Sequence, residues 1–285
     1  MLARQTVKRG YMADTELLLP MLGLLLVIGA FAGLLAGLLG VGGGIVLVPA
    51  FFHAFKELGY DSPQLMQMCL ATSLATIIVT SLRSVSSHNR KGAVDWTILK
   101  SWGPGIAIGA VIGVLTAAWL KSGTLQGVFG VLGLVIGVYL LLGRQDWRLG
   151  EDMPRGIARA ILSPLVGLLS VLMGIGGGSF GVPLMTLYNQ PIHRAVGTAA
   201  GFGVIIAVPS VIGFLFYPID PALTPWGTVG VVNIPTFLII IAMTLITAPL
   251  GVKLAHAMNP KPLKRVLGGF LVIVALNMMR KSIGL

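Results

Sequence analysis

The sequence predicts an all-α polytopic membrane protein built from two inverted-topology repeats. Three observations support this fold class: an apolar composition, a series of membrane-length apolar segments and a duplicated glycine motif. Hydrophobic residues make up 55% of the 285 residues and charged residues only 10%, and the mean hydropathy is +0.92. A soluble chain of this length would need far more polar surface to cover its core.

The apolar segments predict about eight transmembrane helices. Most of them approach the ~20 residues that cross a hydrocarbon core. Backbone groups in lipid must be hydrogen-bonded within the protein, so we expect each segment to be helical. The segments are residues 17–39, 65–82, 103–120, 124–142, 157–174, 195–217, 231–252 and 263–279.

A glycine motif occurs twice in these apolar surroundings. Residues 40–49 (GVGGGIVLVP) return as residues 174–183 (GIGGGSFGVP), with every glycine of the first copy and the proline retained. Three consecutive glycines allow the chain to leave helical geometry. We therefore expect a glycine-broken helical hairpin in each repeat, with a short apolar arm after each triple glycine.

Further matches extend the duplication along the chain. Residues 71–73 (ATS) pair with 197–199 (GTA), and 110–130 with 248–268. These matches predict an N-terminal cytosolic or periplasmic tail over 1–16, a first transmembrane repeat over 17–142, a charged linker over 143–156 and a second repeat over 157–285.

The distribution of Lys and Arg predicts the orientation. The net charge of +11 is spread over short loops, chiefly 83–100, 142–159 and 252–265. This pattern favours membrane orientation by the positive-inside rule over a nucleic-acid partner. With these loops inside, residues 157–190 must dip into the membrane and return, which makes the second repeat inverted. The basic N-terminus, with Arg4, Lys8 and Arg9, disagrees with strict inversion.

Two broken hairpins are suited to binding an anion. A break exposes unpaired N–H groups, and a half-helix that starts beyond it adds the positive end of its dipole. Packing of small residues is the alternative for the glycines, and bonding to the i−4 carbonyl is the alternative for the hydroxyls. The candidate binding residues are Gly42, Gly43, Gly44, Thr72, Ser73, Gly176, Gly177, Gly178, Ser179 and Thr198.

Three basic residues are candidates for gating or for balancing the charge of an anion. Arg83 interrupts an apolar run, where an arginine is costly unless it faces water or a partner; interfacial snorkelling is its alternative. His193 and Arg194 begin the segment that carries Thr198, and a solvated loop charge is the alternative for both. We expect no metal site and no cofactor, because no His, Cys or carboxylate cluster has ligand spacing.

These motifs together resemble the TauE/SafE family. The resemblance rests on the paired GxGGGxxxVP motifs, on residues 88–96 (HNRKGAVDW) and on residues 191–198 (PIHRAVGT), and it covers nearly the whole chain after residue 17. It implies a carrier that exports a small anion, sulfite or an organosulfonate, across a bacterial or archaeal inner membrane. The expected partners are the anion and membrane lipid, and a homodimer is left open.

Three other functions remain as alternatives. An anion channel would share the glycine-lined break but would conduct without alternating access. A structural scaffold would need no break. An intramembrane hydrolase could use Ser179 in a GxSxG pattern with His193 or His256 as base, but the duplication has Ile45 at the equivalent position. We therefore expect no enzyme and no catalytic residue.

The chain has no nucleotide-binding motif, so we expect secondary transport. An inside-negative potential drives a monoanion outward with about 2.3 kcal/mol per 100 mV, which suffices without a coupled ion. The expected mechanism is alternating access, in which the two glycine hairpins move against a frame formed by the remaining helices.

Overall fold

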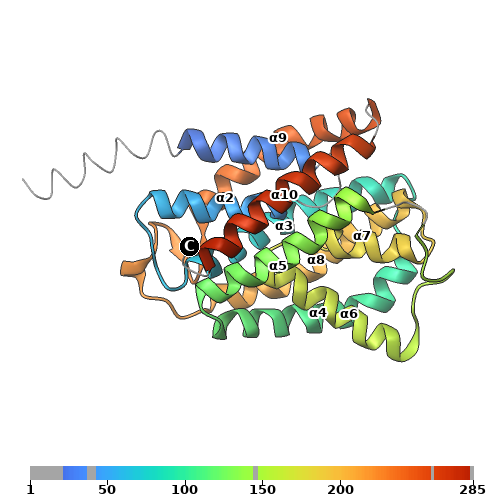
Figure 1. The fold of residues 1–285 in the computed structure, drawn as a ribbon, viewed down its shortest axis with the longest axis horizontal. Helices are drawn as coiled ribbons and strands as arrows, with labels where there is room; N and C mark the ends of the chain where they lie inside the picture. The colour runs from blue at the N-terminus through green and yellow to red at the C-terminus, as the bar shows by residue number, and fades with distance from the viewer. Residues whose placement is uncertain (1–21, 37–42, 144–146, 258–259, 283–285) are drawn as a thin grey trace, which may run out of the picture.

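The protein is a bundle of helices that run mostly along the long axis of the molecule (Figure 1). The structure, a computed structural model, describes residues 22–36, 43–143, 147–257 and 260–282. Helices dominate both parts of the chain, as the apolar segments predicted. The chain is an all-α polytopic membrane protein.

The described residues of the first part of the chain form a first helix, a short helix and three longer helices. The first helix is described over Leu22–Ala36, and residues 37–42 of the first break lie outside the described residues. The following helices are α2 (Gly44–Glu57), α3 (Leu65–Arg90), α4 (Trp96–Trp119) and α5 (Ser122–Leu142).

The second part repeats this order of elements. A 3-10 turn (Pro221–Leu223) and a small antiparallel hairpin, β1 (Thr228–Val229) and β2 (Val232–Asn233), lie before α9. The helices are α6 (Gly156–Leu172), α7 (Gly178–Leu187), α8 (Ile192–Leu215), α9 (Ile234–Ala257) and α10 (Pro260–Ser282).

Five of the described helices are long and apolar enough to cross a membrane: α3, α4, α5, α8 and the Ile234–Gly251 part of α9. The first helix, α6 and α7 are apolar but shorter. Each of the eight apolar segments contains a helix, and so does each arm that follows a triple glycine.

The expected loop over residues 83–100 is much shorter in the structure. The helix α3 continues to Arg90 and α4 already begins at Trp96. Asp95 explains the early start of α4, because its carboxylate accepts hydrogen bonds from the N–H groups of Thr97 and Ile98, both at 3.0 Å. This is an N-cap, which sequence hydropathy does not detect.

Glycines allow the helices to pack closely. A Cβ atom at Gly33 of the first helix would lie 2.7 Å from the Cα of Thr244 on α9, and one at Gly167 of α6 would lie 2.8 Å from the N of Ala110 on α4. On α5 and α10, a Cβ at Gly268 would lie 2.8 Å from the carbonyl oxygen of Gly137. Small residues of this kind let helix backbones approach each other in membranes.

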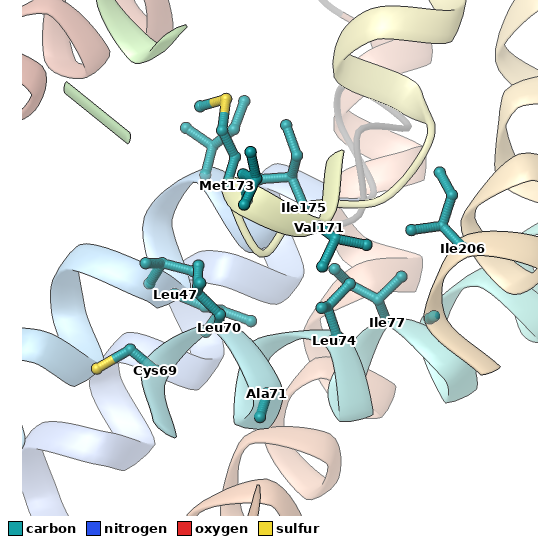
Figure 2. Packing of buried hydrophobic residues seen from close by; sticks show 14 of the residues in the cluster. Leu47, Cys69, Leu70, Ala71, Leu74, Ile77, Val171, Met173, Ile175 and Ile206 are labelled. Carbon is teal, nitrogen blue, oxygen red and sulfur yellow. The ribbon is translucent and has the colours of Figure 1, made fainter. Parts of the chain in front are cut away.

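The core lies where α2, α3, α8 and the end of α6 meet. Figure 2 shows apolar side chains from these four elements converging around α3, including Leu47, Leu74, Val171, Ile175 and Ile206. All five are buried. The second glycine break is therefore enclosed by protein.

Candidate functional site

The second glycine break is a defined end of one helix followed by the start of another. Gly174 has a left-handed φ of 61°, and its N–H donates to the carbonyl of Val171 at 2.8 Å. The N–H of Ile175 donates to the carbonyl of Ser170 at 2.9 Å. These two bonds form a Schellman motif, which terminates α6 and satisfies its last carbonyl groups.

The start of α7 leaves a run of N–H groups unpaired. Gly181 is the first residue here whose N–H finds a carbonyl, that of Gly177 at 2.7 Å. Within the described part of the chain, the N–H groups of residues 176–180 make no hydrogen bond. Buried N–H groups are normally paired, so this run is suited to an acceptor supplied by a ligand.

A contact of the linker shows that the start of α6 and the end of α7 lie at the same end of the bundle. The N–H of Leu149, shortly before α6, donates to the carbonyl of Leu187, the last residue of α7, at 2.7 Å. Asn189 also donates to Glu151 at 3.2 Å. The segment therefore enters the bundle, breaks and returns.

The two glycine breaks are in contact. A Cβ atom at Gly44 would lie 2.6 Å from the carbonyl oxygen of Gly174 and 3.0 Å from the Cα of Ile175. Gly43 has a φ of 70°, which alanine rarely adopts. Gly42 lies outside the described residues.

Ser73 connects α3 to the second break. Its hydroxyl donates to the carbonyl of Gly174 at 2.7 Å, and this bond is buried. That carbonyl would otherwise present an unpaired negative dipole beside the unpaired N–H groups. Ser73 therefore satisfies this carbonyl in the buried interior.

Thr72 and Thr198 make matching contacts with the opposite part of the chain. Thr72 on α3 accepts from the N–H of Asn233 at 3.0 Å, and Thr198 on α8 accepts from the N–H of Asp95 at 2.8 Å. Asn233 and Asp95 each cap a helix, since the Asn233 side chain accepts from the N–H of Thr236 at 3.0 Å. Both threonine oxygens thus already act as acceptors at the starts of α9 and α4.

Replacing these threonines with valine is expected to lower the free energy of unfolding. Thr72→Val leaves the buried N–H of Asn233 without an acceptor, at a cost of about 1–3 kcal/mol. Thr198→Val should cost less, because Asp95 lies closer to water and its bond is only partly buried. Thermal unfolding in detergent measures both. Thr116→Val is the control, because the exposed Thr116 hydroxyl bonds only within its own helix, to Ile112 at 2.8 Å; an equal shift for all three variants would contradict the assignment.

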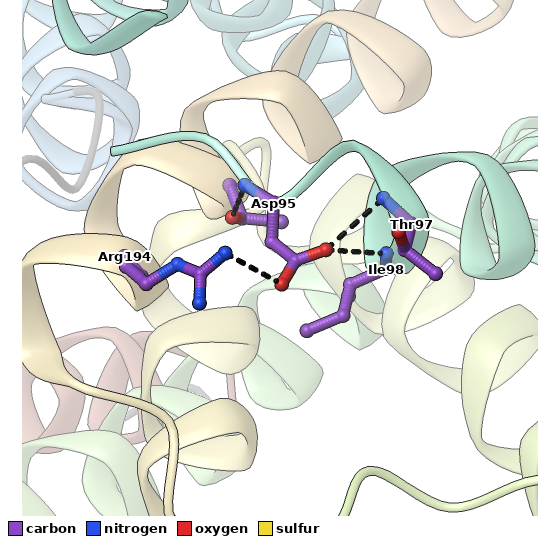
Figure 3. A network of polar contacts seen from close by, with 5 residues as sticks. Asp95, Thr97, Ile98 and Arg194 are labelled. Atoms are coloured by element: carbon purple, nitrogen blue, oxygen red, sulfur yellow. Dashed lines mark hydrogen bonds and ion pairs between the residues drawn. The ribbon is translucent and has the colours of Figure 1, made fainter. Parts of the chain in front are cut away.

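Arg194 forms an ion pair with the cap of α4. Its guanidinium lies 3.2 Å from a carboxylate oxygen of Asp95, and Figure 3 shows this pair beside the capping bonds to Thr97 and Ile98. His193 is exposed at the start of α8. Both basic residues lie in the first turn of α8.

Arg83 is exposed on α3 and forms no ion pair within the described residues. Ser179 is buried, and its hydroxyl has no hydrogen-bond partner among the described residues. No contact joins Ser179 to the exposed His193, and the side chain of His256 lies outside the described residues. The described geometry thus gives Ser179 no base.

Two polar residues near these contacts were missed by sequence reasoning. Asn233 donates three hydrogen bonds and accepts one, and these bonds join the hairpin, α9 and α3. Asn233 is the equivalent of Asp95 in the duplicated sequence, and this equivalence could have identified it. Ser81 lies two turns after Ser73 on α3, and a Cβ atom at Gly176 would lie 3.9 Å from its Oγ. The helical spacing from Ser73 could have identified it.

Comparison with known proteins identifies the family. A model of the family "Sulfite exporter TauE/SafE" matches residues 25–278. The chain belongs to the TauE/SafE family. This TauE/SafE protein is 30% identical to a probable membrane transporter protein of Haemophilus influenzae, over 90% of the chain and 98% of the relative. It is 26% identical to one of Methanocaldococcus jannaschii, over 92% and 96%, and no solved structure matches. The protein is thus a multi-pass membrane transporter.

Proposed function

We propose that this TauE/SafE protein is a secondary transporter that exports a small anion, sulfite or an organosulfonate, across a bacterial or archaeal inner membrane. The observation that carries the proposal is the run of unpaired N–H groups over residues 176–180, at the start of α7 and inside the protein. Helix N-termini with free N–H groups bind anions.

The charge of the surroundings supports an anionic substrate. The buried polar side chains of the described residues are all neutral Ser, Thr, Gln and Asn. No described carboxylate lies at the break, since the described acidic residues occupy loops and helix ends. A site made of neutral donors attracts an anion without holding it as tightly as a buried ion pair would. We assign Gly43, Gly44, Ser73, Gly176, Gly177, Gly178 and Ser179 to this site, with Thr72 and Thr198 positioning the helices around it.

We further propose that residues 17–142 and 157–285 are inverted repeats, joined by the linker 143–156 and preceded by the tail 1–16. Equivalent residues make equivalent contacts across the molecule. Gly33 packs on α9 as Gly167 packs on α4, and Thr72 contacts Asn233 as Thr198 contacts Asp95. The helices α3 and α8 contact each other, as do α5 and α10. Such exchange is the pattern expected of two repeats related by a twofold axis in the membrane plane.

These contacts favour a particular division into moving parts. The helix α4 packs on α6 and α8, and α9 packs on the first helix and α3. We therefore define bundle one as the first helix, α2, α3 and α9, and bundle two as α6, α7, α8 and α4. Each bundle takes its fourth helix from the other repeat. Alternating access then consists of bundle one moving against bundle two, in place of glycine hairpins moving against a frame.

The proposed site lies at the boundary between the two bundles. Gly44 of bundle one lies against Gly174 of bundle two, and Ser73 of bundle one donates to the same glycine. The breaks are closely packed in this conformation, since a Cβ at Gly176 would lie 3.2 Å from the side chain of Ile77. An anion therefore requires the bundles to separate before it can enter.

Flux of labelled sulfite into proteoliposomes tests the function. We expect saturable uptake, inhibition by excess organosulfonate and exchange against unlabelled sulfite. An imposed potential should drive net flux toward the positive side, by about 2.3 kcal/mol per 100 mV for a monoanion. Flux that neither saturates nor exchanges would instead indicate a channel. Flux equal to that of empty liposomes for sulfite, sulfate and an organosulfonate would contradict the proposal.

A further inference from the structure

Three buried hydroxyl groups, those of Ser81, Ser170 and Ser179, differ from the hydroxyls that bond within their own helix. Thr80, Ser210 and Thr247 bond to the carbonyl four residues earlier, at 3.1, 2.7 and 2.9 Å. This is the usual arrangement for a hydroxyl within a helix. The buried hydroxyls that make no hydrogen bond to any described residue are those of Ser62, Ser81, Ser170, Ser179 and Thr236. Among them, Ser81, Ser170 and Ser179 are 5%, 0% and 4% exposed.

The hydroxyls of Ser81, Ser170 and Ser179 belong to the surroundings of the second break. Ser170 lies on the last turn of α6, and Ser179 is the second residue of α7. Ser81 comes from α3 on the opposite side. A Cβ at Gly203 of α8 would lie 3.2 Å from the Cβ of Ser81, and a Cβ at Gly177 would lie 3.0 Å from the N of Gly203. Ser81 therefore packs across from residues 176 and 177.

An unpaired buried hydroxyl is costly unless something else compensates it. Here the buried hydroxyls of Ser170 and Ser179, together with the hydroxyl of Ser81, accompany five N–H groups that make no hydrogen bond to a described residue, and the described residues place no carboxylate among them. All of these groups can donate a hydrogen bond. The combination fits a ligand with several acceptor oxygens better than it fits a halide, because the separate oxygens of an oxyanion can each reach a donor on a different side of the site.

We propose that Ser81 is a further binding residue, which donates a hydrogen bond from bundle one to an oxyanion held by the N–H groups of bundle two. The inference rests on the proposed transport function. In this arrangement the bound oxyanion connects the two bundles, because it contacts Ser81 on one side and α7 on the other. Ser81 thereby contributes to affinity and to the preference for oxyanions.

The test compares three variants in proteoliposomes, with labelled sulfite as substrate and chloride as competitor. Ser81→Ala should raise the half-saturating sulfite concentration about tenfold, the effect expected for one hydrogen bond to a charged ligand, and leave the maximal flux little changed. Chloride should compete better against this variant than against the wild type. Ser81→Cys, which keeps the volume and a weak donor, should fall between the two.

Ser210→Ala is the matched control, because Ser210 is equally buried and its hydroxyl is satisfied within α8. It should leave the half-saturating concentration unchanged. If wild-type flux is saturable and Ser81→Ala behaves like Ser210→Ala, the role of Ser81 is wrong and the transport function stands. If the wild-type protein carries no sulfite above empty liposomes, the transport proposal and the role of Ser81 both fall.

Discussion

Replacing both Gly43 and Gly177 with alanine is expected to reduce sulfite flux to the level of empty liposomes. Alanine at Gly43 must adopt a φ of 70°, which costs about 1–2 kcal/mol for an L-residue. A Cβ at Gly177 would collide with Phe202 and lie 2.9 Å from the carbonyl oxygen of Ala199. The start of α7 must therefore move away from α8, which displaces the N–H groups that bind the anion.

The control exchanges two glycines whose added Cβ meets open space. Nothing lies within 4 Å of a Cβ at Gly123 or at Gly269, so Gly123→Ala plus Gly269→Ala should transport like the wild type. Thermal unfolding and size-exclusion profiles establish that each variant is folded. The single variants Gly43→Ala and Gly177→Ala show which break carries the larger effect. Wild-type flux from a folded Gly43→Ala plus Gly177→Ala variant would exclude the breaks from the site.

Adding the anion is also expected to change the distances between helices, and these changes show which helices move together. Spin labels at three exposed positions distinguish bundles from sequence halves: Val27 on the first helix, Ile108 on α4 and Ile161 on α6. If the bundles are the moving parts, adding the anion should leave the distance between Ile108 and Ile161 unchanged. The distance between Ile108 and Val27 should change by several ångströms, although both residues belong to the first half.

The labels are attached through thioether bonds, because sulfite cleaves disulfides. The fully buried Cys69 is replaced with alanine, so that only the introduced cysteines react. A fixed distance from Ile108 to Val27 with a changing distance from Ile108 to Ile161 would show that the sequence halves move as units. Two unchanged distances would contradict alternating access by either division.

Much of the architecture followed from local sequence. Apolar segments identified the helices, because every spanning segment must satisfy its own backbone hydrogen bonds. The triple glycine at residues 176–178 identified the second break, where Gly174 adopts the left-handed conformation that favours glycine. The expected end of the second apolar segment at residue 82 was too early, because α3 extends to Arg90.

The roles of individual hydroxyls did not follow from local sequence. Thr72, Ser73 and Thr198 looked alike as small polar residues near the motifs. In the structure Ser73 donates to the second break, whereas both threonines accept from helix starts in the opposite part of the chain. Ser81 belonged to no motif, and apart from its helical spacing from Ser73 its significance comes from its position opposite Gly176.

The sequence by itself determined that this is a helical membrane transporter of the TauE/SafE family with glycine breaks, because hydropathy and glycine conformation act over a few residues. Only the tertiary structure decided that α4 packs on α6 and α8, that α9 packs on the first helix and α3, and that the two breaks touch. Those contacts join residues far apart in the chain, such as Thr72 and Asn233. They depend on which glycine-lined helix faces meet, and several faces of similar composition were available in the sequence.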